Sequence, residues 1–343
     1  MTIQTIYKCA LCVCLAMVSC LFTPAHSRCD EHPAGKVEAL ETGFYYTIQN
    51  GDTLWDLSHH FFDSPWVWPD LWGKNQDISN PHWIYPGDRI RLYRRSGTGK
   101  SAADTSVFQT AGKENKTDIK ESSFFFYPSI DTVGFVRKDP VKPSGTIFSV
   151  KEDKFMISIG DRVYVRSADG ATQFQSGDRY TIFRTKTLEV NEDGYFGIQH
   201  YLVGLLEIID VNSGFSVAKI VESYRHIEID DLLMPYTPRS KKIALTDKKH
   251  GLEGKIVAAE EDQVVFADHT VVFVNKGHQN GVRKGQIYNA YYRKRAKPSP
   301  DQKPILLSPV NFGEFIVLHT EPTTATAVVT MAEKSIEPGT KFH

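Results

Sequence analysis

The stretch Phe44-Tyr45-Tyr46-Thr47-Ile48-Gln49-Asn50-Gly51-Asp52-Thr53-Leu54-Trp55 decides the fold of the N-terminal third of this chain. It is completed forty residues later by Tyr85-Pro86-Gly87-Asp88-Arg89-Ile90-Arg91-Leu92, and all five tryptophans lie between Phe44 and Tyr93. Apolar and polar residues alternate in 46–48 and again in 89–92, which predicts two short strands. Asn50-Gly51-Asp52 is typical of a tight turn.

Two helices are expected between these strands. Asp52 or Thr53 can cap the first helix, and Asp56 stands three residues after Thr53, as in a capping box. Its buried face is predicted from apolar and small residues at helical spacing, namely Leu54, Leu57, Ser58 and Phe61. The second helix begins at Pro65 or at Pro69, because proline is tolerated only in the first turn of a helix.

Three blocks in this order resemble a LysM domain: 46–55, Leu71-Trp72-Gly73-Lys74-Asn75, and 85–92. The tryptophan-rich insert Asp63 to Pro69 departs from the family pattern. The resemblance covers residues 44–93 and implies a βααβ fold. It also implies binding of glycans that contain N-acetylglucosamine, which in bacteria is usually peptidoglycan.

The resemblance implies a ligand groove between two loops. The first wall is Gly51, Asp52, Thr53 and Leu54, and the second is drawn from 78–85, with Ile78, Trp83, Ile84 and Tyr85 as candidates. Sugar rings have apolar faces, so exposed aromatic side chains such as Trp83 and Tyr85 suit them. We expect Trp55, Trp68 and Trp72 in the core instead, because so small a domain needs large side chains to build one.

The first 27 residues have the features of a signal peptide. Lys8 precedes an apolar run from Cys9 to Phe22, and Ala25-His26-Ser27 offers a cleavage site after Ser27. These features predict export to the periplasm or cell envelope, with no transmembrane span in the mature chain. The alternative is an imperfect lipobox, Met17-Val18-Ser19-Cys20, with Cys20 lipidated.

The remaining sequence predicts a β-rich scaffold in two copies. Residues 94–123 and 237–250 have the composition of linkers, and they separate a β module at 124–236 from a second at 251–343. Five blocks recur at offsets of 108 to 110, which indicates a tandem duplication. The matched pairs are 144–147 with 253–256, 162–165 with 270–273, 176–180 with 284–288, 204–206 with 313–315, and 215–218 with 325–328. The predicted fold class is therefore multidomain α+β and all-β: a βααβ module followed by two small β-barrels or β-sandwiches.

The composition bears on the chemistry that is expected. A formal net charge of -1 over 343 residues removes the basic face that nucleic-acid binding needs, so no nucleic-acid partner is predicted. The sequence shows no pattern typical of a catalytic nucleophile or a zinc peptidase, so we predict no catalytic residue, metal or cofactor.

The predicted function is non-catalytic: binding of peptidoglycan, with the β modules presented to an envelope protein partner. One alternative is a wall hydrolase whose unfamiliar site uses carboxylates such as Glu207, Glu228, Asp230 or Asp231. Another is a structural component of a flagellar or secretion assembly. This alternative follows from a fold analogy between the β modules and small β domains of envelope and flagellar-assembly proteins.

Overall fold

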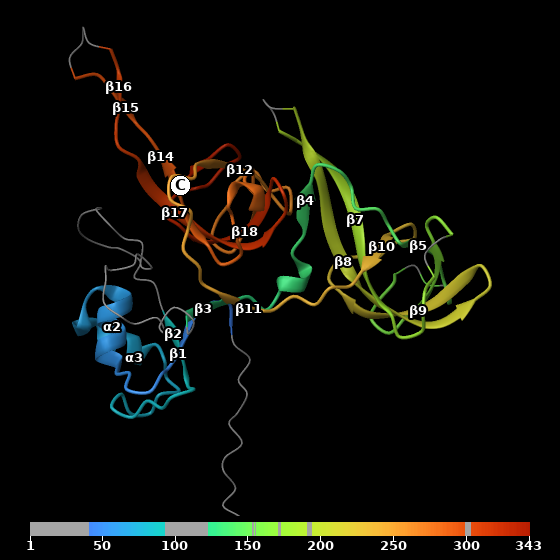
Figure 1. Ribbon diagram of the computed structural model, residues 1–343, viewed down its shortest axis with the longest axis horizontal. Coiled ribbons are helices and arrows are strands. Elements are labelled where there is room, and N and C mark those ends of the chain that lie inside the picture. Colours follow the sequence, from blue (N-terminus) through green and yellow to red (C-terminus); the bar gives the residue numbers. More distant parts are fainter. Residues whose placement is uncertain are drawn as a thin grey trace, which may run out of the picture. The chain divides into compact units, whose positions relative to one another are not determined.

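The computed structural model describes residues 41–92, 123–298 and 303–343, apart from positions 153, 155, 171–172 and 191–193 (Figure 1). The predicted signal peptide, the alternative anchor at Cys20 and nearly all of the predicted linker 94–123 lie outside the described residues. Residues 41–343 group as one unit by their internal contacts. Within the described part of the chain, no helix combines the length and apolarity that a membrane crossing requires.

The aromatic N-terminal stretch folds in the predicted order of strand, helix, helix and strand. Its elements are β1 (Gly43–Thr47), α2 (Leu54–Phe62), the 3-10 turn η1 (Pro65–Val67), α3 (Trp68–Gly73) and β2 (Arg89–Leu92). β1 and β2 pair antiparallel, with Tyr46 opposite Ile90. Tyr46, Leu54, Leu57, Phe61 and Leu71 are buried in the core beneath the helices.

Local chemistry explains where these helices begin and end. Thr53 is the N-cap of α2, and its hydroxyl accepts a hydrogen bond from the Asp56 N–H, as the capping pattern predicted. Asp63 ends α2 in the left-handed conformation, with φ of 54°. Pro65 opens η1 and Pro69 lies in the first turn of α3, so both prolines occupy tolerated positions.

The sheet of this stretch recruits two strands from far along the chain. β3 (Ser123–Phe126) pairs antiparallel with β1, and β11 (Lys242–Ala244) pairs antiparallel with β3, giving the order β11-β3-β1-β2. Phe125 and Ile243 thereby join the core beneath the helices. β11 falls inside the predicted linker 237–250, so part of that segment is a strand.

The first β module contains a closed ring of six strands. β5 (Gly145–Val150), β6 (Arg162–Ser167), β9 (Phe215–Ser223), β8 (Gly194–Asn212), β7 (Arg179–Val190) and β10 (Leu232–Pro235) pair in that order, and β10 returns to β5. β4 (Phe135–Arg137) adds a further strand to β8, after the 3-10 turn η2 (Ile130–Thr132). We call the ring barrel 1.

The second β module is a closed barrel with the same pairing, which we call barrel 2. Its ring is β12 (Gly254–Ala259), β13 (Val271–Val274), β18 (Ala325–Ala332), β17 (Val310–Thr320), β14 (Ile287–Tyr292) and β19 (Lys341–Phe342). The 3-10 turn η3 (His278–Asn280) follows β13, and a two-stranded extension of β15 (Arg295–Ala296) and β16 (Ile305–Leu306) joins β14 to β17.

The six strand pairings of barrel 1 all recur in barrel 2, so the predicted fold class, with tandem β-barrels, is confirmed. The duplication extends to irregularities, because Phe148 in β5 and Val257 in β12 are both bulged positions. The structure corrects two of the predicted matches. Tyr164 lies opposite Val217 and Phe273 lies opposite Thr326, so the offset is 109 at both strands. The predicted offsets of 108 for 162–165 and 110 for 215–218 were wrong by one residue, which would invert the faces of those strands.

Candidate functional site

The loop Gly51–Leu54 is held by its own side chains. Gly51 has φ of 90°, a conformation that favours glycine, and an added Cβ there would meet nothing within 4 Å. The Asp52 carboxylate accepts hydrogen bonds from the Tyr46 hydroxyl and the Gln49 N–H, both at 2.7 Å. Thr53 caps α2, and Leu54 is buried in the core. The side chains of 52–54 therefore shape the loop, and the surface that it can offer a ligand lies around Gly51.

The second predicted wall divides into buried and exposed residues. Ile78 and Ile84 are half-buried against the core beneath the helices. Trp83 and Tyr85 are exposed by 69% and 61% of their surfaces. The Trp72 indole N–H donates to the Ile78 carbonyl at 2.6 Å, which fixes the start of this loop. Large aromatic side chains with so much exposed surface suit a ligand better than they suit the core.

Backbone hydrogen bonds tie the two loops to one end of the sheet. The Ile48 N–H donates to the Asp88 carbonyl at 2.8 Å, and the Gly87 N–H donates to the Ile48 carbonyl at 2.9 Å. The turn before β2 is therefore fixed beside the end of β1, from which the Gly51 loop starts. Asn75 ties α3 to β2, because its side-chain oxygen accepts from the Arg91 N–H at 2.8 Å. The assignment of the eight predicted residues to one groove stays a prediction.

Not all of the tryptophans that were predicted in the core lie there. Trp68 and Trp72 pack against the core as expected. Trp55 is 42% exposed, so its prediction as a core residue was wrong. It faces outward from the first turn of α2 and meets Trp66 edge to face, with ring centroids 4.8 Å apart. Trp66, 76% exposed, comes from the insert and was not predicted as a site residue. The sequence feature that could have pointed to Trp66 is the departure of the insert from the family pattern.

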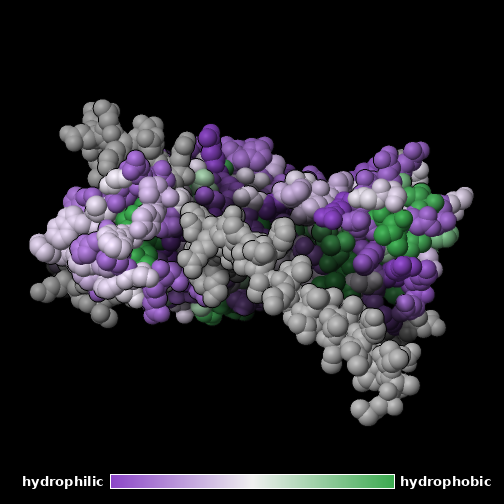
Figure 2. All heavy atoms as spheres, turned by 90° about the horizontal axis from the view of Figure 1, so that it is seen from below, coloured by the Kyte–Doolittle hydropathy of each residue, from purple (hydrophilic) through white to green (hydrophobic). Residues whose placement is uncertain are grey.

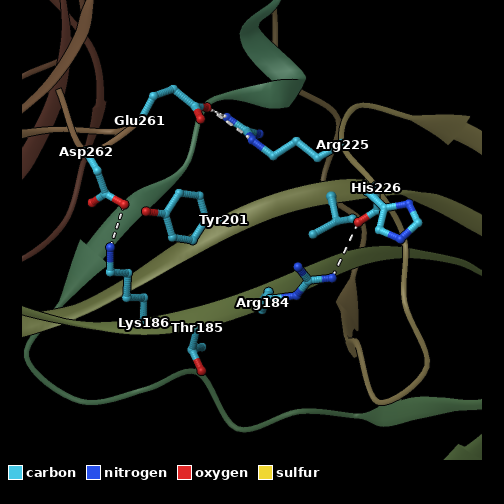
Figure 3. Close-up of a pocket in the computed structure, with 9 residues that line it drawn as sticks. Arg184, Thr185, Lys186, Tyr201, Arg225, His226, Glu261 and Asp262 are labelled. Atoms are coloured by element: carbon cyan, nitrogen blue, oxygen red, sulfur yellow. Dashed lines mark hydrogen bonds and ion pairs between the residues drawn. The ribbon is translucent and has the colours of Figure 1, made fainter.

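A cavity of about 440 Å³ lies against the long strands of barrel 1 and is lined mostly by charged residues (Figure 3). Figure 3 shows Lys186 directed at Asp262 and Arg225 directed at Glu261. Arg184 makes two hydrogen bonds to the Asp231 carboxylate, at 2.8 and 3.0 Å. Because the charges in and beside this cavity neutralise one another, it offers little to a charged ligand.

Three of the four carboxylates considered for glycan cleavage, those of Glu207, Glu228 and Asp231, are engaged in ion pairs with arginine. Glu207 pairs with Arg179 at 2.9 Å, and Glu228 lies 3.3 Å from Arg184. Burial raises the pKa of Asp231, against the opposing effect of its hydrogen bond from Arg184. Asp230 has φ of 72° and occupies a turn, where its N–H donates to the Ile147 carbonyl. In the described ranges, no group of three His, Cys, Asp or Glu residues is arranged to hold a metal ion.

Titratable groups gather where β4 and the β7–β8 hairpin meet barrel 2. Glu260 is buried and accepts from the Gly134 N–H at 2.8 Å, and burial raises its pKa to about 7. His200 is buried as well, and burial lowers its pKa to about 4. Burial opposes ionisation of Glu321, but hydrogen bonds from His319 and Arg137 lower its pKa overall. This cluster acts in the packing of the two barrels on each other.

Comparison with known proteins identifies the N-terminal stretch. Residues 46–92 match the model of the LysM domain family. The chain is also 35% identical over 57 residues to YqbP of Bacillus subtilis (strain 168), described as an uncharacterized protein. That alignment covers 14% of this chain and 26% of YqbP, so the chain spans about a quarter of this relative. The resemblance to LysM domains is confirmed, and LysM domains bind glycans such as peptidoglycan.

Proposed function

We propose, on the premise of a LysM domain at residues 46–92, that this protein is an exported, non-catalytic peptidoglycan-binding protein of the cell envelope. The LysM domain holds the glycan strand, and the tandem barrels are presented to a protein partner in the envelope. The observation that carries the proposal is the family match together with two exposed aromatic residues, Trp83 and Tyr85, which lie just before a turn that is hydrogen-bonded to Ile48.

The physical chemistry of this loop supports glycan binding. A sugar ring presents C–H groups on its faces and hydroxyl groups around its rim, so an exposed indole or phenol can cover one face. The Gly51 turn lets backbone approach closely, because no side chain stands in the way. The Asp52 carboxylate is already occupied by Tyr46 and Gln49, which leaves backbone groups as the donors and acceptors for an acetamido group.

We also propose that the protein does not cleave the glycan that it binds. Glu207 and Asp231, two of the carboxylates that a hydrolase could use, are held by Arg179 and Arg184. A general acid for glycan cleavage must reach the glycosidic oxygen, and a carboxylate held in an ion pair with an arginine of its own barrel is not free to do so. Zymography on labelled peptidoglycan should therefore show no clearing by the mature chain.

Retention on purified sacculi tests the binding. The full mature chain is the proper reagent, because a fragment ending near residue 95 would lack β3 and leave the edge of β1 unpaired. We expect the mature chain to co-sediment with sacculi and to be released by soluble fragments of the glycan. A chain that stays in the supernatant would exclude the proposed function.

Single substitutions test the site. Trp83→Ala or Tyr85→Ala should weaken retention by about 2- to 10-fold, as expected for loss of an aromatic contact of about 0.5–1.5 kcal/mol. Trp66→Ala is the matched control, because Trp66 is at least as exposed but lies on the insert outside the predicted groove. If Trp66→Ala weakened retention more than Trp83→Ala, the glycan would lie on the Trp55–Trp66 pair instead.

A further inference from the structure

One face of barrel 2 is covered by barrel 1. The buried cluster between them joins Val136 and Leu188 to Val257 and Phe273, with Phe196 half-buried at its border. The Thr326 hydroxyl donates to the Gly134 carbonyl at 2.9 Å, and the Gln199 amide donates to the Glu260 carbonyl at 2.9 Å. The covering elements are β4 and the hairpin of β7 and β8, which lie on β12, β13 and β18.

The equivalent face of barrel 1 is open. At the offset of 109, Val257 and Phe273 correspond to Phe148 and Tyr164, and Thr324 corresponds to Phe215. The three aromatic rings form a row across β5, β6 and β9, with centroids 6.1 Å apart between Phe148 and Tyr164 and 5.6 Å apart between Tyr164 and Phe215. Phe148 is 36% exposed and Phe215 is 37% exposed. We call this row the aromatic face; Figure 2 shows exposed hydrophobic residues grouped in the part of the molecule that carries β5 and β9.

The aromatic face is apolar at the positions that a hairpin would cover. A neighbouring row on barrel 2, Val271, Ile316 and Val328, packs beneath the helices of the N-terminal stretch. Its counterparts on barrel 1 are the charged residues Arg162, Glu207 and Lys219. Barrel 1 therefore has charged residues in the row whose cover it lacks, and it has aromatic residues in the row that matches the hairpin contact. This contrast between the two rows supports an occupant for the aromatic face.

Barrel 2 has the matching hairpin. Among the described residues, no other element of the chain covers this hairpin. The counterpart of the β7–β8 hairpin is β14 and β17 with their extension β15–β16. Ile305 pairs with Ala296 as Gly197 pairs with Leu188, and Ile305, Leu306 and Leu307 are exposed by 51%, 55% and 41%. Exposed aliphatic residues of this number on one extension are typical of a contact surface. We call this segment the apolar hairpin.

A charge pair is also repeated. Arg225 pairs with Glu261 across the covered interface. Their counterparts are Lys334, beside the apolar hairpin, and Glu152, beside the aromatic face, and both are exposed. Within one molecule Glu152 lies 3.0 Å from Lys154, and the Lys334 ammonium lies 3.2 Å from the Tyr292 hydroxyl. Opposite charges thus stand at the two positions that a repeated interface would join.

We propose that this protein assembles head to tail, with the apolar hairpin of one copy seated on the aromatic face of the next. The contact repeats between molecules the part of the packing of barrel 1 on barrel 2 that the β7–β8 hairpin contributes within one molecule. Its two sides are different surfaces, so a pair of joined copies still has one free hairpin and one free face. Such a heterologous contact builds rings or open filaments rather than closed dimers.

Sedimentation of the mature chain tests the assembly. Over about 1–100 µM, a range that covers modest protein affinities, we expect the weight-average mass to rise with concentration beyond that of a dimer. Phe148→Asp should remove the aromatic face and Leu306→Asp the apolar hairpin, and each variant alone should sediment as a monomer. Val264→Asp is the control, since Val264 is 74% exposed and belongs to neither surface.

Mixing the two variants gives the decisive result. Phe148→Asp retains its hairpin and Leu306→Asp retains its face, so an equimolar mixture should form a complex of about twice the monomer mass and nothing larger. Circular dichroism should show both variants folded, because both substitutions are at exposed positions. A wild-type chain that stays monomeric over the whole range would overturn the proposal. So would a mixture that stays monomeric under conditions where the wild-type chain associates.

Discussion

Asp52 and Thr53 fix the turn before α2 through their own side-chain oxygens, and the sequence predicted this role for Thr53. The capping pattern is local, since Asp56 is only three residues away, so it could be found without knowledge of the fold. Trp55 could not be placed in the same way. Its exposure depends on Trp66, eleven residues later, and on the path of an insert for which the family pattern gives no guidance.

A second prediction for a single residue concerns the ionisation of Glu260. Its pKa in the folded chain, about 7, lies above its ordinary value of 4.5. A raised pKa means that the stability contributed by the protonated group is complete below pH 4.5 and is lost as the pH rises through 7. Glu260→Gln keeps an oxygen for the Gly134 N–H and carries no charge at any pH.

We therefore expect the wild type and Glu260→Gln to have similar unfolding free energies at pH 5. At pH 8 the variant should gain up to about 3 kcal/mol relative to the wild type. Urea unfolding at the two pH values measures this difference. A gap between the proteins that does not change with pH would show that Glu260 is ionised throughout.

β3 and β11 are the elements that the sequence did not reveal. Each has three or four residues, and the strands that they pair with lie about 80 to 120 residues away in the sequence. In the apolar run Met156 to Ile159, Ile157 forms only an isolated bridge, to Ile227. The glycan loops were predictable because a family pattern covers them, whereas these sheet additions depend on tertiary packing.

Gly204 in β8 tests the close packing of strands in barrel 1. A Cβ at this position would lie 2.5 Å from the Glu222 carbonyl oxygen, which is backbone and cannot rotate away. Gly204→Ala should therefore lower the unfolding free energy by about 1–3 kcal/mol. Gly73→Ala, where a Cβ meets nothing within 4 Å, should be neutral or slightly stabilising. Thermal unfolding of both variants measures the difference. Equal melting temperatures would contradict the close approach of Gly204 to the Glu222 carbonyl.

At the scale of the whole molecule, the sequence was most informative about the two barrels, because a repeat can be recognised without knowledge of its fold. The offset near 109 predicted a shared topology, and all six pairings recur. The one-residue errors at two strands arose from matching short apolar runs, in which neighbouring residues are alike. Strand register depends on which face is buried, and barrel 1 buries part of its outer surface only by packing on barrel 2.

Equivalent positions in the two barrels should respond differently to the same change. Val257 is buried between the barrels, whereas its counterpart Phe148 is on the open face. Val257→Asp should cost about 3 kcal/mol or more, because it buries a carboxylate without a partner. Phe148→Asp, measured in dilute solution, should cost less than about 1 kcal/mol. Urea unfolding of the pair measures the contrast, and similar losses would mean that Phe148 is covered within the single molecule.

The pairing of β1 with β3 has a mechanical consequence. The covalent route from β2 to β3 runs through residues 93–122, yet β3 is already bonded to β1 over four residue pairs. Under the proposed function, tension between the glycan loops and the barrels would load that short ladder together with the apolar core that contains Phe125 and Ile243. Residues 93–122 join β2 to β3 in the sequence, and a chain of that number of residues can span on the order of 100 Å at about 3.3 Å per residue when fully extended. If the ladder ruptured, the covalent connection would still join the glycan loops to the barrels, and the ladder could form again once the tension fell.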